Sequence, residues 1–283
     1  MKNLLDTLLP HIIIIRPLNI LAAIISILLS SVITQYNGHS INIIYATLVV
    51  VFFTAGANTL NDFFDYEIDM VNRPNRPLSS GKVPKNYALI YSILYFIIGL
   101  FFAYQLNYNS KIVSIFISFP LLILYNYNLK GYPLIGNIVV ALILSLTFVF
   151  AGYVFNNIIP MIIPSILAFG LTLIREIIKD IADIKGDRKV GLKTFPIIFG
   201  KEKSFKLCVI LSVLFGVGAF IPFINGHYNM LYGILLILTV EIPLAKVVIL
   251  IINKPSIEMV KKSADLLKMS TFGGLLSILV GTV

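Results

Sequence analysis

The 283-residue chain has the composition of an integral membrane protein. Its residues are 58% hydrophobic and only 12% charged, with a mean hydropathy of +0.94, whereas soluble domains are about 25% charged. The single cysteine excludes a disulfide framework. The formal net charge of +9 is typical of basic cytoplasmic loops in a membrane protein, so we expect no nucleic-acid partner.

Nine apolar stretches are long enough to cross a membrane as helices, since a span needs about 20 mostly apolar residues. Strands of a membrane barrel would alternate residue by residue between apolar and polar, and these stretches do not. In chain order the predicted spans are residues 12–35, 41–64, 87–104, 112–127, 134–155, 158–181, 205–224, 230–252 and 264–283. The sequence therefore predicts an all-α, polytopic membrane protein with one transmembrane domain over residues 1–283.

The distribution of Lys and Arg predicts the orientation of these spans. If the N-terminus is cytoplasmic, the inside loops are residues 65–86, 128–133, 182–204 and 253–263. These loops hold most of the basic residues, whereas the outside loops hold only Lys111. The asymmetry follows the positive-inside rule. We therefore expect a protein of the cell membrane, in contact with membrane lipids, with its N-terminus in the cytoplasm and its C-terminus outside.

Two groups of polar residues end the second and sixth predicted spans with the same spacing. The first acidic motif is Asn58, Asp62, Asp65 and Asp69, and the second acidic motif is Glu176, Asp180, Asp183 and Asp187. Steps of four, three and four residues place side chains on one face of a helix. Because the motifs lie four spans apart, they predict two four-helix halves, residues 12–127 and 134–252, followed by an extra ninth helix.

The motifs predict a site for a hard cation and a phosphate ester. Two acidic faces that meet inside a bundle repel each other strongly, so a cation is expected between them. Carboxylate and amide oxygens suit Mg²⁺ or Ca²⁺, and Mg²⁺ commonly fills its remaining positions with water and substrate phosphates. Zinc is disfavoured because the three histidines are scattered. The alternative is that the acids only solvate the helix ends and pair with neighbouring Arg and Lys.

These segments also resemble a known family. The stretch NDFFDYEID at residues 61–69 is similar to the NDxxDxxxD motif of UbiA-type intramembrane prenyltransferases, and DIADIKGD at 180–187 is similar to their second aspartate motif. The stretch LYNYNLKGYPLIGN at 124–137 resembles the segment between their fourth and fifth helices. Within the family, NRPNRPLSSGKV at 72–83 most resembles the archaeal branch that forms digeranylgeranylglyceryl phosphate.

The resemblance implies an enzyme that transfers an isoprenyl group from an isoprenyl diphosphate donor to an acceptor in the membrane. In the archaeal branch the donor is geranylgeranyl diphosphate, and the acceptor is the free hydroxyl of the lipid phosphate geranylgeranylglyceryl phosphate. An aromatic acceptor, a quinone or porphyrin-type precursor, stays open within this class. A cation-coupled transporter stays open outside it, because intramembrane acids in repeated halves are also typical of transporters. The sequence leaves the oligomeric state open.

The resemblance also implies roles for individual residues around Mg²⁺ and a diphosphate. The expected metal ligands are Asn61, Asp62, Asp65, Asp69, Asp180, Asp183 and Asp187. The expected substrate-binding residues are Asn58, Arg73, Arg76, Lys130, Lys179 and Lys185, most of which carry the positive charge that binds phosphate. Asp65, Asp183 and Tyr125 are expected to be catalytic, Tyr125 because an aromatic face stabilises a carbocation. Glu176 is expected to hold Arg175, Lys179 or water.

Overall fold

The structure is a computed structural model that describes residues 2–253 and 255–282. Within these ranges the chain is helical and contains no strand, as the all-α prediction requires. Met1 and Val283, the ends of the predicted domain and of its ninth span, lie outside the described residues, as does Lys254 of the last predicted inside loop.

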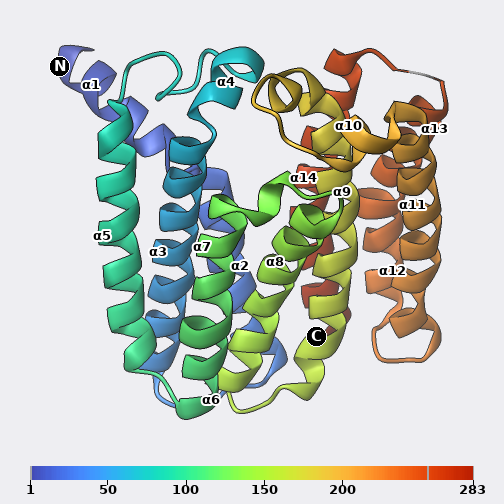
Figure 1. Cartoon of the computed structure of the whole chain (residues 1–283). Coiled ribbons are helices and arrows are strands. Elements are labelled where there is room, and N and C mark those ends of the chain that lie inside the picture. Colours follow the sequence, from blue (N-terminus) through green and yellow to red (C-terminus); the bar gives the residue numbers. More distant parts are fainter. Residues whose placement is uncertain (1, 254, 283) are drawn as a thin grey trace.

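The helices follow one another through short connections (Figure 1). Their bounds are α1 (Lys2–Ile13), α2 (Pro17–Ile33), α3 (Ser40–Phe64), α4 (Tyr66–Asn72), α5 (Lys85–Tyr104), α6 (Tyr108–Lys111), α7 (Phe119–Tyr127), α8 (Ile135–Val154), α9 (Ile162–Lys189), α10 (Phe195–Phe199), α11 (Lys201–Ile224), α12 (Met230–Leu236), α13 (Ile242–Ile252) and α14 (Ile257–Thr282). The π-helical segments Ile112–Ser118 and Ile237–Glu241 connect α6 to α7 and α12 to α13 without a break.

Eight helices among the described residues are long and apolar enough to cross a membrane, which makes the chain a multi-pass membrane protein. They are Ser40–Phe64, Lys85–Tyr104, Tyr108–Tyr127, Ile135–Val154, Ile159–Lys189, Lys201–Ile224, Met230–Ile252 and Ile257–Thr282. They correspond to the second through ninth predicted spans. The first predicted span contains only the shorter apolar helix Pro17–Ile33, so the count of nine is not confirmed.

The first predicted span differs from the structure because a turn interrupts it. The helix α1 ends at Ile13, and Arg16 adopts left-handed backbone angles, φ 55° and ψ 75°, before Pro17 begins α2. A residue that precedes proline is disfavoured in the helical conformation, whereas proline fits the first helical position. The chain therefore turns at Arg16, and the arginine enters the bundle from outside any helix.

The sixth predicted span ends too early, because α9 continues past residue 181 to Lys189. Ile181 and Ile184 are buried in the core formed with α11 and α14, so packing continues the helix beyond the most apolar stretch. The helix then ends before Gly191, whose positive φ of 78° favours glycine. Asp183 and Asp187, beyond the predicted end of the span, thus lie on the same helix as Glu176 and Asp180, in agreement with their helical spacing.

The bundle places both motifs at one end. The helix α3 packs against α2 and α5, and α9 packs against α8, α11 and α14. In Figure 1, α4 and α10 lie at the end where the chain begins, and α6 lies at the opposite end. One apolar core cluster gathers mainly residues of α2, α3, α5, the segment from α6 to α7, and α8, whereas another gathers mainly residues of α9 and α11 to α14. The division into two sequence halves stays a prediction.

Candidate active site

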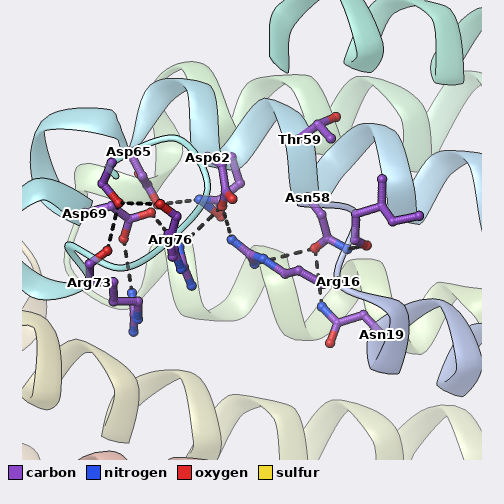
Figure 2. Close-up of polar contacts among 12 residues, drawn as sticks. Arg16, Asn19, Asn58, Thr59, Asp62, Asp65, Asp69, Arg73 and Arg76 are labelled. Carbon is purple, nitrogen blue, oxygen red and sulfur yellow. Dashed lines mark hydrogen bonds and ion pairs between the residues drawn. The ribbon is translucent and has the colours of Figure 1, made fainter. Parts of the chain in front are cut away.

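The first acidic motif runs across the junction of α3 and α4. The helix axis changes at Asp65, but the main-chain hydrogen bonds continue, from Asp65 N to Asn61 O at 2.8 Å and from Asp69 N to Asp65 O at 2.7 Å. The side chains of Asp62, Asp65 and Asp69 consequently stay in one row (Figure 2). All three are buried, so their charges need partners inside the protein.

Cations from three other segments supply those partners. Arg16 forms an ion pair with Asp62, and Figure 2 shows its guanidinium extending from the turn before α2. Arg76 lies 3.3 Å from Asp62 and 2.6 Å from Asp69. Lys130, in the loop between α7 and α8, pairs with Asp65. The first acidic motif is therefore neutralised from the turn before α2, the segment after α4 and the loop before α8.

The surroundings shift the pKa values of two of these carboxyl groups in opposite directions. Burial alone raises the pKa of Asp65, but the charge and hydrogen bond of Lys130 outweigh it, so this pKa lies below its usual value. Burial holds the pKa of Asp69 above its usual value despite Arg76. Asp65 is thus the more firmly ionised of the two, as a ligand for a cation should be.

Arg73 joins the first acidic motif to the second. Its Nη2 donates to Asp183 Oδ2 at 2.7 Å, and its Nη1 lies 3.5 Å from Asp69 Oδ1. Next to it, Asn72 donates from Nδ2 to the main-chain oxygen of Asp183 at 2.9 Å and accepts from Gly186 N at 3.1 Å. A Cβ at residue 186 would overlap the Asn72 side chain. The ends of α4 and α9 are therefore in direct contact.

The second acidic motif has fewer cationic partners. Asp180 accepts from Asn137 Nδ2 at 2.8 Å. Glu176 accepts from Arg175 at 2.7 Å and from Lys179 at 3.0 Å, which are the partners expected for it. Asp187 is buried, and no ion pair holds it or Asp180 within the described part of the chain.

A small hollow lies between the motifs and adjoins a large cavity. The acidic hollow is lined by Asp65, Tyr125, Lys130, Asp180, Asp183 and Asp187, among others. The cavity has a volume of about 520 Å³ and largely apolar walls that include Val49, Phe53, Phe148 and Leu275. Arg16, Arg73 and Arg76 line both spaces. A molecule with an anionic head and a long apolar tail matches this combination of surfaces.

The donor atoms in the hollow suit a hard divalent ion. Carboxylate and amide oxygens are the ligands that Mg²⁺ and Ca²⁺ prefer, and the buried Oδ1 atom of Asp183, which lines the hollow, has no hydrogen-bond partner. In the described ranges, however, no three acidic, His or Cys side chains converge as a metal-ligand group. The carboxylates instead form ion pairs with Arg73, Arg76 and Lys130. The oxygen ligands are thus of the type that a divalent ion prefers, but they are not arranged as a coordination shell.

The structure does not place every predicted residue in the hollow. Lys179 lines it, but Lys185 is exposed and lines neither space. Asp62 and Asp69 also lie outside both linings. Asn58 lines the cavity, where it donates to Ile15 O at 2.9 Å.

Sequence reasoning missed Arg16, which contacts the first acidic motif directly. Its signal is the single charge within the apolar run IIIIRPLNI, followed at once by proline. A charge inside a predicted span is costly in a membrane and marks a functional position by default. Asn72 and Asn137 were also missed, and both act on the second acidic motif from other segments.

Comparison with known proteins gives a consistent result. The model of the UbiA prenyltransferase family matches residues 23–269. The digeranylgeranylglyceryl phosphate synthase of Methanosphaera stadtmanae is 40% identical over 231 residues, which cover 81% of this chain and 83% of that protein.

Two solved structures are also similar. A structure of a digeranylgeranylglyceryl phosphate synthase in membranes has a TM-score of 0.74 at 31% identity and covers 100% of this chain and 99% of that chain. A UbiA homologue from Archaeoglobus fulgidus, bound to DMAPP and Mg²⁺, has a TM-score of 0.67 at 18% identity over 94% of this chain and 97% of that chain, a likeness of fold alone. The predicted family and enzyme class are thus confirmed, and the chain belongs to the UbiA prenyltransferase family.

Proposed function

We propose that this prenyltransferase transfers a geranylgeranyl group from geranylgeranyl diphosphate to the free hydroxyl of geranylgeranylglyceryl phosphate in an Mg²⁺-dependent reaction. The product is digeranylgeranylglyceryl phosphate, an intermediate of archaeal ether lipids. The observation that carries the proposal is the bridge of Arg73 between Asp69 and Asp183, which closes two acidic motifs around one hollow beside an apolar cavity. The names of the relatives support the choice of acceptor.

The acidic hollow is the proposed site of the donor's diphosphate. Mg²⁺ held by Asp65, Asp180, Asp183 and Asp187, with Asn61, would neutralise the leaving group and favour cleavage of the allylic C–O bond. Lys130 and Arg73 now pair with Asp65 and Asp183. When a diphosphate enters, both cations can bind its oxygens, because Arg and Lys bind phosphate as well as carboxylate.

Tyr125 is the proposed stabiliser of the allylic cation. It is buried at the border of the hollow and the cavity, where the first carbon of a bound isoprenyl chain would lie. Its aromatic face favours positive charge, and the apolar walls keep water from capturing the cation. The acceptor oxygen then forms the ether bond, and its proton passes to a carboxylate or to the released diphosphate.

The membrane orientation is part of the proposal. The end of the bundle with both motifs carries the basic connections, so it faces the cytoplasm under the positive-inside rule. The chain then begins in the cytoplasm, and α14 runs from the motif end toward the outside (Figure 1). Both substrates would present their phosphate groups at the inner leaflet.

The test is a transfer assay with the purified full-length protein and radiolabelled geranylgeranyl diphosphate. We expect digeranylgeranylglyceryl phosphate with Mg²⁺, no product with EDTA, and recovery when Mg²⁺ is restored in excess. The same assay offers a hydroxybenzoate and a naphthoate as aromatic acceptors. Product from an aromatic acceptor alone would contradict the proposed acceptor, and the absence of any diphosphate release, together with cation-driven uptake in vesicles, would favour a transporter.

A further inference from the structure

A basic cluster lines the large cavity away from the acidic hollow. It consists of Arg175 on α9 and of Lys261 and Lys268 on α14, and none of the three lines the acidic hollow. The helix α14 packs directly against α9. Arg175 precedes Asp183 by eight residues on α9, which separates them by about 12 Å along the helix axis at the rise of an α-helix. The cavity thus has a second charged region, in which Arg175 lies beside Glu176 and further along α9 from the hollow than Asp180, Asp183 and Asp187.

The positive charge of this cluster is only partly balanced within the described residues, by Glu176 beside Arg175 and by Asp265, which lines the same cavity. Arg175, Arg16 and Arg76 repel Lys268, and Asp265 attracts it. Among the described residues Lys268 forms no ion pair. Like charges repel strongly where the surroundings are apolar, so an anion in the cavity would relieve this repulsion.

Arg175 has a hydrogen-bond donor with no acceptor nearby. Its Nη1 donates to Glu176 at 2.7 Å, but its Nε is buried and has no hydrogen-bond partner. A buried donor without a partner destabilises the protein, and a bound anion that accepts from it removes this penalty. Because Glu176 also accepts from Lys179 at 3.0 Å, its charge is shared between two cations.

Lys261 fixes the position of the cluster relative to the acidic motifs. Its Nζ donates to the main-chain oxygen of Asn72 at 3.2 Å, next to the residue that bridges the motifs. Lys268 follows seven residues later on α14, and residues so spaced lie on the same face of a helix. The cluster therefore extends along α14 from the end of α4 into the apolar cavity.

We propose that Arg175 and Lys268, with Lys261 beside Asn72, bind the phosphate monoester of the lipid acceptor. This inference rests on the proposed function and names the group on the protein that recognises the acceptor. Two anions must be bound together during transfer, and the acidic hollow suits the diphosphate that arrives with a metal. A monoester needs no metal when Arg and Lys bind it directly. The cluster would thereby favour a phosphorylated acceptor over an aromatic one.

The test compares acceptors with and without the phosphate. In Lys268→Gln and Arg175→Gln we expect KM for geranylgeranylglyceryl phosphate to rise about tenfold to a hundredfold, the effect of losing one charged hydrogen bond. KM for geranylgeranyl diphosphate and for unphosphorylated geranylgeranylglycerol should not change. Lys268→Arg should recover most of the affinity. Lys262→Gln is the matched control on the same helix, because Lys262 is exposed, lines neither space and pairs with the exposed Glu258 at 3.0 Å.

A binding measurement separates this inference from the proposed function. Geranylgeranylglyceryl phosphate should bind the wild-type protein in EDTA, and Lys268→Gln should bind it at least about tenfold more weakly. Failure of the wild type to bind it, or equal binding by Lys268→Gln, overturns the inference. A rise in KM for the donor instead would assign the cluster to the diphosphate. Transfer by the wild type to this acceptor supports the function in either case, and transfer only to an aromatic acceptor refutes the function.

Discussion

The two acidic motifs share one spacing but lie in different surroundings. In the first acidic motif, Asp62, Asp65 and Asp69 each pair with a cation from another segment. In the second acidic motif, Asp180 has an amide partner and Asp187 has no ion pair within the described residues. The first is a fixed network that ties four segments together, and the second offers oxygens that are less fully occupied. Equal spacing thus does not mean equal roles.

The largest expected effect comes from Asp65 and Asp183, one aspartate of each motif that lines the hollow. Asp65→Ala and Asp183→Ala should each lower transfer at least about a thousandfold, because each removes a carboxylate that would neutralise the leaving group through the metal. Circular dichroism should show that both variants remain helical. Near-normal turnover of either variant at saturating Mg²⁺ would contradict the assignment of the hollow as the metal site.

A second pair of variants tests whether the first acidic motif mainly stabilises the fold and the second mainly serves activity. Asp62→Asn leaves Arg16 without its partner and should lower the free energy of unfolding by about 2 kcal/mol, since breaking a buried ion pair strands the other charge. Asp187→Asn strands no cation and should leave stability unchanged while activity falls about tenfold or more. Thermal unfolding by circular dichroism in detergent measures the first, and the transfer assay measures the second. Equal losses of stability in both variants would contradict a structural role for Asp62 and a purely functional role for Asp187.

Hydropathy and spacing predict much of the fold, but not the network around the first acidic motif. Eight predicted spans correspond to long helices because each is apolar along its length. Hydropathy counts Arg16 as one polar residue in an apolar run, and its partner Asp62 lies 46 residues away, so only the tertiary structure connects them. The end of α9 was missed for a related reason: Ile184 packs inside the protein rather than against lipid, and hydropathy alone does not register such packing.

The bridge between the motifs gives a third variant of intermediate effect. Arg73→Lys keeps the charge but loses the two-pronged contact with Asp69 and Asp183, and lysine does not reproduce the guanidinium fork. We expect transfer to fall about tenfold, chiefly through KM for the diphosphate. Arg188→Gln is the control, since Arg188 is exposed near the end of α9. Unchanged donor kinetics in Arg73→Lys would show that the contact between the motifs does not depend on this fork.

The smallest expected effect concerns the backbone contact beneath that bridge. In Gly186→Ala the new Cβ meets the end of the Asn72 side chain, which must turn away and give up its hydrogen bonds to Gly186 N and Asp183 O. The cost should be about 1 kcal/mol, because a flexible side chain moves more easily than backbone. Asn72→Ala should lose a similar amount, and the double variant should lose no more than either alone, since the Cβ then meets no side chain. Fully additive losses in thermal unfolding would mean that Gly186 is needed for its backbone conformation rather than for its contact with α4.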